Sequence, residues 1–213
     1  MKIALFSDLH GFLPKIDPNI ADYVFIAGDI CPDYIVPQQY YWFVDEFVPW
    51  LKTIPPTLYI PGNHDFALER FGSKENFYLE QGEHVLPNGD RVYAFCPTIC
   101  PMWAFDISDK NMEPLLTQAN NFDILVCHNP PFGVCDRVDG KISHHVGSNS
   151  ILKLIQRVQP KLCVFGHIHE GYGTKWVGKT LCVNCAFRDV QYKPRNKYPV
   201  IDTDTLEIDF VHL

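Results

Sequence analysis

The sequence predicts an α/β fold, a four-layer α-β-β-α sandwich made of two mixed sheets. Short apolar runs rich in β-branched and aromatic residues recur along the chain and predict about ten or eleven strands. A single sheet of that size would be large, whereas two sheets packed face to face with helices outside close one core. With 213 residues, 46% of them apolar, the chain is long enough for such a core, and we expect a single domain over residues 1–213.

The first long helix is expected after the second apolar run. Between the first two runs, Pro14 and Pro18 leave room only for a short or broken helix. In residues 36–53 the apolar side chains fall three or four positions apart, as on one face of an amphipathic helix. Pro49 lies inside this pattern, so the helix either kinks there or ends near Phe47.

Turn and cap signals organise the rest of the chain. Asn88-Gly89 supplies the positive φ angles of a tight hairpin turn. Ser148 or Asn149 is suited to cap a following helix. The last segments alternate as strands around a turn at Gly178-Lys179. These patterns predict a hairpin of 83–86 and 91–96, helices at about 111–120 and 149–158, and strands at 175–177, 180–184, 200–202 and 206–210.

The net charge of −7 argues against a surface that tracks a nucleic-acid backbone, because such binding depends on many Lys and Arg contacts. We therefore expect no long nucleic acid as a partner, although a small nucleotide is not excluded. The first apolar run is interrupted by Ser7 and Asp8, which makes it too short for a signal peptide or a spanning helix. We expect a cytoplasmic protein without a membrane partner.

The eight cysteines are expected to be reduced, because a domain of this size does not need disulfides to be stable. Cys182 and Cys185 have the spacing of half a zinc ribbon. No second matching pair exists, since Cys96 and Cys100 have a different spacing. A structural zinc is not expected.

Five predicted strands end in residues that can bind a metal. The carboxyl ends of strands are where α/β proteins build their sites, so we expect these endings to converge on one rim. The side chains at these strand ends supply oxygen and imidazole nitrogen donors, and none of them supplies a thiolate. The predicted ligands are Asp8, His10, Asp29, Asn63, His128, His167 and His169.

Seven ligands are too many for one ion and enough for two divalent ions that share a carboxylate. Two such ions, about 3.5–4 Å apart, lower the pKa of a bridging water and neutralise a phosphoryl transition state. Mixed oxygen and nitrogen ligands suit Mn, Fe, Zn, Co or Ni rather than calcium, and Mn is the ion we favour. Two carboxylates against two divalent cations leave a charge of +2, or +1 with a hydroxide, which attracts a phosphate ester.

Two residues beside the ligand Asn63 are predicted to be catalytic. His64 offers a proton donor that need not touch a metal, and adjacent residues of an extended segment point in different directions. Asp65 follows directly as a possible partner that holds the imidazole in orientation. The alternative for the tetrapeptide is an ordinary polar turn. His144 and His145 are either further ligands or loop histidines.

Taken together, these motifs are similar to the full signature of the calcineurin-like metallophosphoesterase superfamily. The surroundings resemble a small single-domain subgroup that includes brain-expressed metallophosphodiesterases and class III cyclic nucleotide phosphodiesterases. The matching residues are Asp8-x-His10, Gly28-Asp29, Gly62-Asn63-His64-Asp65, His128 and Gly166-His167-x-His169.

The resemblance implies how the ligands divide between two ions. It implies Asp8, His10, Asp29 and His169 at one ion, and Asp29, Asn63, His128 and His167 at the other, with Asp29 bridging. His64 matches the family's histidine that contacts the phosphate and protonates the leaving group. Asn129 stands where the subgroup often has Gly or Thr.

The expected function is therefore a metal-dependent phosphodiesterase acting on a small, nucleotide-type phosphate ester. The alternatives are a phosphomonoesterase, a nuclease for short oligonucleotides, or an inactive metal-binding scaffold. A diester is favoured because no predicted ligand has an Arg within two residues, and a monoester dianion is usually held by guanidinium groups. Arg137 and Arg188 are the nearest plausible donors.

Aromatic residues near the predicted site have two interpretations. Residues 96–105 are rich in Pro and include Trp103, which suits a lid or a wall. Trp103, Phe132 and Tyr172 could stack against a base or an aryl group, or could serve simple packing.

Overall fold

The computed structural model describes residues 1–72, 81–139 and 144–213, and it confirms two large mixed sheets. The first sheet has five strands in the order β13-β12-β1-β2-β3. β1, β2 and β3 are parallel, and the C-terminal strands β12 and β13 are added antiparallel at one edge. The strands are β1 (Lys2–Phe6), β2 (Tyr23–Ala27), β3 (Thr57–Ile60), β12 (Lys197–Asp202) and β13 (Ile208–His212).

The second sheet has six strands in the order β10-β11-β9-β6-β5-β4. Its central strands are parallel, and its two edge strands, β4 and β10, are antiparallel to their neighbours. The strands are β4 (Gly82–Val85), β5 (Arg91–Phe95), β6 (Ile124–Cys127), β9 (Leu162–Phe165), β10 (Gly173–Val177) and β11 (Thr180–Asn184). A two-stranded ribbon, β7 (Arg137–Val138) and β8 (His144–His145), lies apart from both sheets.

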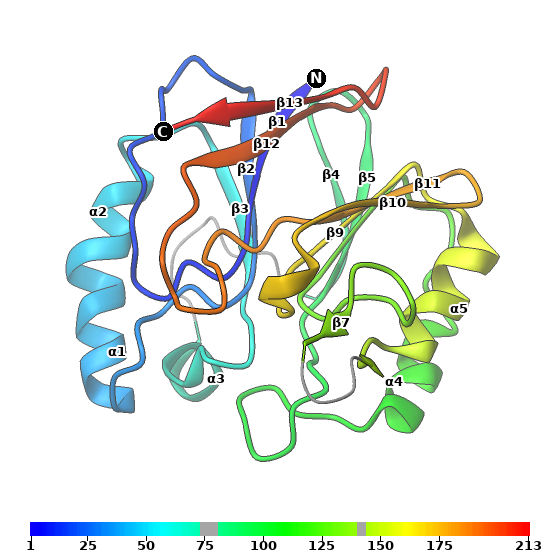
Figure 1. Cartoon of the computed structure of the whole chain (residues 1–213), viewed down its shortest axis with the longest axis horizontal. Coiled ribbons are helices and arrows are strands. Elements are labelled where there is room, and N and C mark those ends of the chain that lie inside the picture. Colours follow the sequence, from blue (N-terminus) through cyan, green and yellow to red (C-terminus); the bar gives the residue numbers. More distant parts are fainter. Residues whose placement is uncertain (73–80, 140–143) are drawn as a thin grey trace.

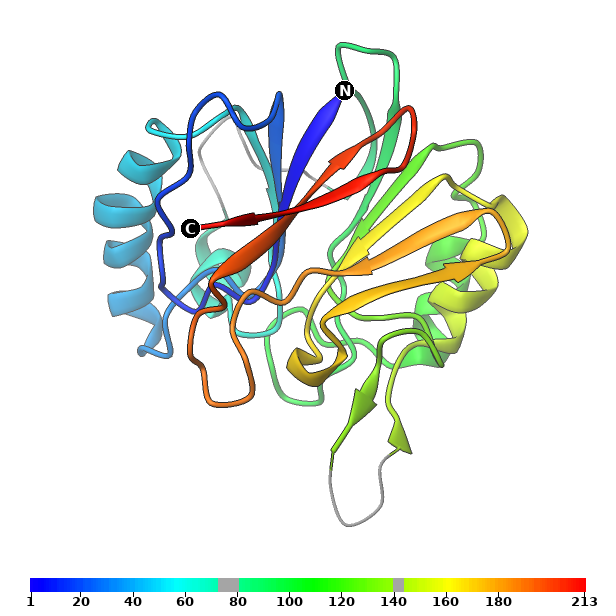
Figure 2. The ribbon, with the colours of Figure 1, turned by 45° about the horizontal axis from the view of Figure 1, so that its top comes forward.

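Helices cover the outer face of each sheet, which gives the four layers seen in Figures 1 and 2. On the first sheet the helical segments are α1 (Val36–Trp42), η1 (Phe43–Phe47) and α2 (Val48–Leu51). On the second sheet they are α4 (Asp109–Leu116) and α5 (Asn149–Val158). The short α3 (Phe66–Phe71) and the 3-10 turn η2 (His169–Gly171) follow strand ends. None of the helices in the described residues is long and apolar enough to cross a membrane.

Alternate residues of each central strand enter different core layers. In β1, Ile3 and Leu5 pack between the two sheets, whereas Ala4 and Phe6 pack under the helices of the first sheet. In β6, Val126 joins the layer between the sheets and Leu125 packs under α4 and α5. Burial on both faces explains why these strands are continuous apolar runs.

The predicted helix at 36–53 does not end near Phe47. The chain passes from α1 through η1, which is π-helical, into α2, and Pro49 lies inside α2. The N–H of Val48 donates to the carbonyl of Phe43, five residues earlier. This wider turn changes the hydrogen-bond register just before a residue that has no N–H to donate.

Most other predicted elements are confirmed. The hairpin at Asn88-Gly89 forms between β4 and β5. Ser148 is the N-cap of α5, and its Oγ accepts from the N–H of Ile151 at 3.0 Å. The predicted helix at 111–120 is displaced toward the N-terminus, because Ser108 caps α4. Residues 8–22, all of them described, contain turns and no helix.

Candidate metal centre

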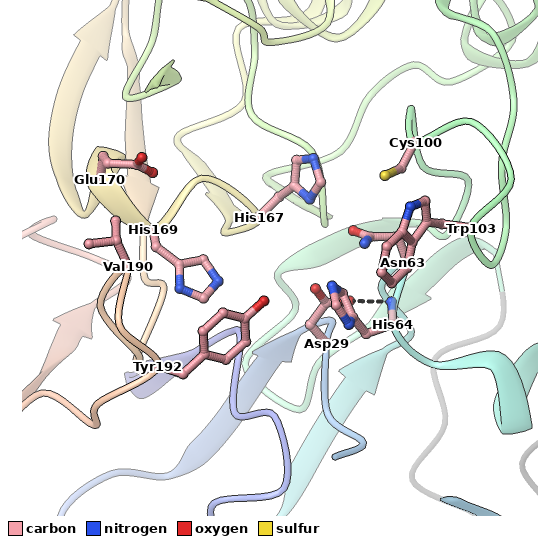
Figure 3. A pocket seen from close by; sticks show the side chains of 10 residues that line it. All are labelled: Asp29, Asn63, His64, Cys100, Trp103, His167, His169, Glu170, Val190 and Tyr192. Atoms are coloured by element: carbon pink, nitrogen blue, oxygen red, sulfur yellow. Dashed lines mark hydrogen bonds between the residues drawn. The ribbon is translucent and has the colours of Figure 1, made fainter. Parts of the chain in front are cut away.

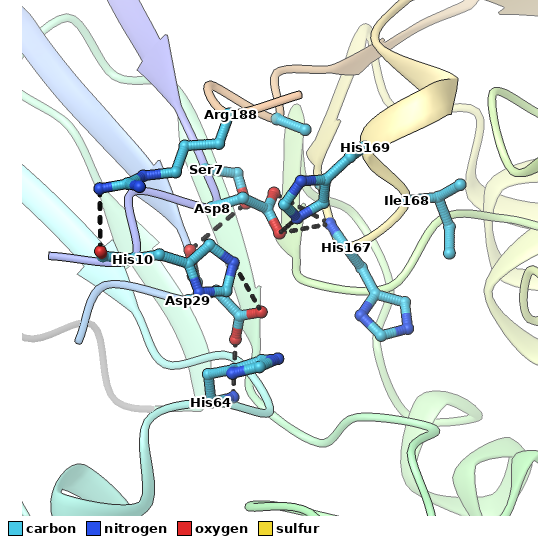
Figure 4. A network of polar contacts seen from close by, with 12 residues as sticks. Ser7, Asp8, His10, Asp29, His64, His167, Ile168, His169 and Arg188 are labelled. Carbon is cyan, nitrogen blue, oxygen red and sulfur yellow. Dashed lines mark hydrogen bonds and ion pairs between the residues drawn. The ribbon is translucent and has the colours of Figure 1, made fainter. Parts of the chain in front are cut away.

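The seven predicted ligands come together at the carboxyl ends of β1, β2 and β3 from one sheet and of β6 and β9 from the other. Within the part of the chain that the structure describes, the donor atoms of six of them, all but Asn63, belong to groups in which all atoms lie within 4.8 Å of one another. Asp8, His10 and His169 form one group, and Asp29, His128 and His167 form another; a third, His10, Asp29 and His64, overlaps both and includes His64. Figure 4 shows several of these side chains meeting between the two sheets.

Asp29 is the residue that links the two groups. Its Oδ2 lies 3.8 Å from Nε2 of His10 and 3.3 Å from Nε2 of His128. On one side, Nε2 of His169 is 3.4 Å from Oδ1 of Asp8. On the other, Nε2 of His128 is 3.0 Å from Oδ1 of Asn63. Asp29 therefore lies within reach of ligands of both groups.

The backbone at four of the ligands is in the left-handed region, which is uncommon for residues other than glycine. Asp8 has a φ of 56°, His10 of 42°, Asp29 of 54° and His167 of 65°. Such conformations cluster at functional sites, where the surrounding structure must hold them. They turn the chain sharply as it leaves each strand and keep the side chains at the rim.

Two glycines permit the close approach of strand ends. A Cβ at Gly62 would collide with the carboxylate of Asp29, and a Cβ at Gly166 would collide with the side chains of Asp8 and Ser7. A side chain at Gly62 would push its loop away from the loop of Asp29, and a side chain at Gly166 would push its loop away from that of Asp8.

Hydrogen bonds fix the orientation of the ligands. Nδ1 of His128 donates to the carbonyl of Ala27 at 2.7 Å, and Nδ1 of His169 donates to the carbonyl of Asp189 at 2.9 Å. Each ring therefore has Nε2 available for a metal, an arrangement typical of metal-binding histidines. The carboxylates are held by backbone donors: the N–H of His64 donates to Asp29 at 2.8 Å.

The buried charges of the site compensate one another. Burial alone would lower the pKa of His128, but Asp29 and Asp8 beside it raise the pKa to about 10. Burial would likewise raise the pKa of Asp29, yet His128 and His10 nearby bring it well below its usual range. Burial and the charge of His128 lower the pKa of His167 to about 4. These carboxylates favour positive charge in their midst, which divalent ions supply.

The ring nitrogens of His10 also fit a metal ion. His10 is buried, and within the described chain neither of its ring nitrogens has a hydrogen-bond partner. Buried polar atoms without a partner are rare in folded proteins. A metal ion at Nε2, beside Asp29, would satisfy one of these nitrogens.

His64 lies beside the ligands, but Asp65 does not orient it. Nδ1 of His64 is 2.7 Å from Oδ1 of Asp33, an exposed residue of the loop after β2. The fully buried carboxylate of Asp65 instead accepts from the backbone N–H groups of Ile30, Cys31 and Gly62. The predicted contact is therefore wrong, because Asp65 points into the protein to bind two strand-end loops.

The Asp65 carboxyl group is also electrostatically unusual. Burial and the charge of Asp29 raise its pKa to about 6, although three backbone donors act in the opposite direction. This carboxyl group joins the loops that carry Asp29 and Asn63, which indicates a structural role. Sequence reasoning missed Asp33 as the partner of His64, although an acidic residue four positions after Asp29 was a usable signal.

A cavity of about 320 Å³ opens over the ligands. In Figure 3, Trp103 and Cys100 lie on one side of it, and Tyr192, Val190 and Glu170 lie on the other. No Lys or Arg of the described residues is among those that line it. The full lining set is Asp29, Asn63, His64, Cys100, Trp103, His167, His169, Glu170, Val190 and Tyr192.

Trp103 is the aromatic residue that the prediction placed correctly. Phe132 packs against His145, and the ring of Tyr172 lies under the guanidinium of Arg195, so neither lines the cavity. Tyr192, which the sequence did not single out, lines it instead. Nothing in the sequence pattern around Tyr192 marked it, because it follows the last recognisable motif.

The remaining candidates lie outside the ligand groups found among the described residues. His145 pairs with the buried Asp136 at 2.5 Å, and His144 is exposed in β8. Cys182 and Cys185 are buried, and all eight cysteines are free thiols.

A buried set of carboxylates, imidazoles and one amide lies at the facing ends of the two sheets and forms a candidate metal site. A family model described as calcineurin-like phosphoesterase matches residues 1–171, and the chain belongs to this family of metallophosphoesterases. The chain is 32% identical to human metallophosphoesterase domain-containing protein 1, over 93% of this chain and 70% of that protein. It is 41% identical to the uncharacterized protein MJ1162 of Methanocaldococcus jannaschii, over 86% of this chain and 87% of that one.

Solved structures of similar fold agree with the architecture. The protein TT1561 of Thermus thermophilus superposes with a TM-score of 0.64 at 17% identity, covering 99% of this chain and 98% of that one. A protein described as a novel archaeal phosphodiesterase superposes with a TM-score of 0.54 at 17% identity, covering the whole of both chains. These likenesses support the fold.

Proposed function

We propose that the protein is a phosphodiesterase that uses two divalent metal ions to hydrolyse small, nucleotide-type phosphodiesters. The observation that carries the proposal is the convergence of seven oxygen and imidazole ligands around the shared carboxylate of Asp29. Asp8, His10, Asp29 and His169 would hold one ion, and Asp29, Asn63, His128 and His167 the other. When bound, such ions lower the pKa of a water and neutralise charge on the phosphoryl group, and Mn is the ion we favour.

His64 is the proton donor in this proposal. Its Nδ1 contacts Asp33, which leaves Nε2 as the nitrogen that would face the substrate. A leaving alkoxide needs a proton as its bond to phosphorus breaks, and an imidazole in hydrogen-bond reach is the side chain that most often gives one. The contact with Asp33 fixes the orientation of the ring.

A diester is preferred over a monoester because of the charges around the cavity. The cavity lining described above supplies no guanidinium to hold the second negative charge of a monoester. Arg188 lies near, but its guanidinium donates to the carbonyls of Leu9, His10 and Tyr192. With two ions, the carboxylates of Asp8 and Asp29 and a hydroxide, the metal centre itself, without Glu170 of the cavity lining, would carry +1, which a diester's single charge balances.

The test is a hydrolysis panel with each candidate metal, Mn, Fe, Co, Zn and Ni. It compares an aryl phosphodiester, the matched aryl monoester, cyclic nucleotides and short oligonucleotides. We expect the highest kcat/KM on small diesters, with Asp29→Ala as the control for contaminating phosphatases. A higher kcat/KM on the aryl monoester would contradict the diester preference. Cleavage of oligonucleotides alone would indicate a nuclease.

A further inference from the structure

Two aromatic side chains form opposite walls of the cavity (Figure 3). The ring centroid of Trp103 lies 4.4 Å from that of His64. The ring centroid of Tyr192 lies 4.7 Å from that of His10 and 5.3 Å from that of His169. Trp103 is 40% exposed and Tyr192 39% exposed, so each keeps a free surface while packing against the site.

The Trp103 wall is attached to the ligand loop behind it. The N–H of Ala104 donates to the carbonyl of Asn63 at 3.1 Å, and the N–H of Trp103 donates to the carbonyl of Cys100 at 3.0 Å. Phe66 also packs against the indole, with ring centroids 5.8 Å apart. The indole is thus held beside His64 before any substrate binds.

The Tyr192 wall is attached to the other group of ligands. The carbonyl of Asp189 accepts both from the N–H of Tyr192 and from Nδ1 of His169, each at 2.9 Å. Nη1 of Arg188 donates to the carbonyl of Tyr192 at 2.7 Å, while the same guanidinium binds the carbonyl of His10. Tyr192 therefore has a fixed position relative to the ligands His10 and His169.

We propose that Trp103 binds the leaving group of the diester and that Tyr192 binds the group that stays on the phosphate. This assignment rests on the proposed function. During hydrolysis the hydroxide oxygen forms a bond to phosphorus and the bond from phosphorus to the leaving oxygen breaks. The electron pair stays on the leaving oxygen, which takes the proton of His64. The leaving group must therefore lie at His64, where Trp103 is the adjoining aromatic surface.

The retained group occupies the opposite side for the same reason. It remains bonded to the phosphate, away from His64, and the aromatic surface on that side belongs to Tyr192. Stacking on an aromatic side chain tolerates many bases, because every base has a flat π-face. Two such walls suit a diester that has an aromatic group at each end, such as a dinucleotide or an aryl ester of a nucleotide.

Three substrates separate the two walls. Methyl p-nitrophenyl phosphate has an aryl leaving group and a small retained group. Thymidine 5′-(p-nitrophenyl phosphate) has the same leaving group and a large retained group. Methyl trifluoroethyl phosphate has a small leaving group and a small retained group. Differences in kcat/KM between pairs of substrates isolate one wall at a time, whereas general damage to the site lowers all three values together.

For Tyr192→Ala, we expect kcat/KM to fall about tenfold on the thymidine diester and less than twofold on the two methyl esters, from the usual worth of stacking. For Trp103→Ala, we expect about a tenfold fall on both nitrophenyl esters and less than twofold on the trifluoroethyl ester. Tyr192→Phe and Trp103→Phe, which keep a ring, should retain most of the activity. Trp176→Ala, an exposed tryptophan of β10 away from the cavity, is the matched control.

Calorimetric binding of thymidine 5′-monophosphate, the retained product, gives a readout without turnover. We expect Tyr192→Ala to weaken it about tenfold and Trp103→Ala to leave it within twofold. The proposal is overturned if Trp103→Ala and Tyr192→Ala lower kcat/KM on all three substrates by the same factor, or if the two preferences are exchanged. Failure of the wild-type protein to hydrolyse any diester with any metal would instead overturn the proposed function, and the assignment of walls with it.

Discussion

The carboxyl ends of the parallel strands in the first sheet and the amino ends of those in the second use charged residues in opposite ways. At the carboxyl ends, Asp8 and Asp29 are buried among imidazoles, on backbone in the left-handed region. At the amino ends, carboxylates are paired with cations or backbone donors. Asp90 lies 2.5 Å from Nζ of Lys161, and Asp123 accepts from the N–H of Arg91 at 2.8 Å.

This difference between the two strand ends indicates that the carboxyl ends serve function and the amino ends serve stability. Asp90 at the amino ends is paired with a Lys, whereas among the described residues no Lys or Arg forms an ion pair with Asp8 or Asp29, whose partners are backbone N–H groups and imidazoles; these carboxylates are suited to metal ions. Residues at functional sites are often poor choices for stability alone. We therefore expect changes at the carboxyl ends to affect metal binding and turnover, and changes at the amino ends to affect the free energy of unfolding.

The largest expected effect is on turnover in Asp29→Ala. Because Asp29 contacts both ligand groups, its loss should remove metal from both positions. We expect kcat to fall by more than the roughly 10- to 100-fold that loss of an outer partner of a metal ligand causes. His128→Ala should mainly affect one ion. Metal content by elemental analysis and kcat at saturating metal are the measurements.

Asp90→Ala at the opposite end is the control, and its kcat should stay near the wild-type value. Near wild-type turnover in Asp29→Ala or His128→Ala at saturating metal would show that the dinuclear interpretation is wrong.

His64→Ala tests the carboxyl-end residue that is expected to act without holding a metal. We expect kcat to fall by roughly 10²- to 10⁴-fold on an unactivated diester while both ions remain bound. A nitrophenyl diester should lose less, because its leaving group needs little protonation. Asp33→Asn should show the same dependence on leaving group with a smaller loss. Equal losses on both substrates, or loss of an ion, would contradict the role of proton donor.

Asp65 is an exception among the carboxylates at the carboxyl ends of the strands, because we expect it to stabilise the fold. The variant Asp65→Ala tests this expectation. The variant leaves the N–H groups of Ile30, Cys31 and Gly62 without their acceptor. At about 1 kcal/mol or more for each unsatisfied donor, we expect a loss of about 3 kcal/mol in the free energy of unfolding. Denaturant titration measures it.

Asp33→Ala is the control, since that side chain is 56% exposed and its loss should change stability by about 0.5 kcal/mol or less. If Asp65→Ala were as stable as Asp33→Ala, the structural role of Asp65 would be refuted.

Removing metal tests whether the ions join the two sheets. Each proposed ion takes ligands from both, so chelation should lower the free energy of unfolding. At an ion concentration 100 times the dissociation constant, the expected loss is about 2.7 kcal/mol. Thermal unfolding with and without chelator measures the shift, and Asp29→Ala should show little of it. An equal shift in that variant would mean that the ions stabilise the protein elsewhere.

Much of the fold was predictable from the sequence because its strands are apolar on both faces and end abruptly in polar residues. Asp29 and His128 could be predicted as ligands because each follows such a run, His128 directly and Asp29 after Gly28. The helix around Pro49 was harder, since a π-helical turn depends on hydrogen-bond register and not on spacing. Its wider turn is an adjustment that the pattern of apolar residues does not encode.

The site was predictable where its residues end strands and unpredictable where they lie in loops. His64 and Asp65 are neighbours in sequence, yet their side chains point to different partners, so proximity along the chain gave the wrong partner for the imidazole. Asp33 reaches His64 only through the fold. Tyr192 reaches the cavity because Arg188 and Asp189 hold its loop, and neither contact has a sequence signature.

The smallest expected effect is a pH dependence at the amino ends. Burial alone would raise the pKa of Asp90, but Lys161 and Asn88, whose side chains contact its two oxygens, lower it below the usual range. A carboxyl group whose pKa is lower in the folded state stabilises the protein above the pKa of the unfolded chain, about 3.9. That contribution is lost as the pH falls below this value.

Asp90→Asn should therefore be about 1–2 kcal/mol less stable than the wild type at pH 7, the usual worth of a hydrogen bond to a charged group. The difference should shrink as the pH falls from about 5 toward 3, because protonation of Asp90 in the wild type removes the same interaction. Unfolding in chelator keeps the carboxyl ends of the strands out of the measurement. Asp204→Asn, which removes an exposed pair with the N-terminal amine, is the matched control and should change stability by well under about 1 kcal/mol. A difference between Asp90→Asn and wild type that stayed constant from pH 7 to pH 3 would show that the pair with Lys161 does not stabilise this end of the sandwich through its charge.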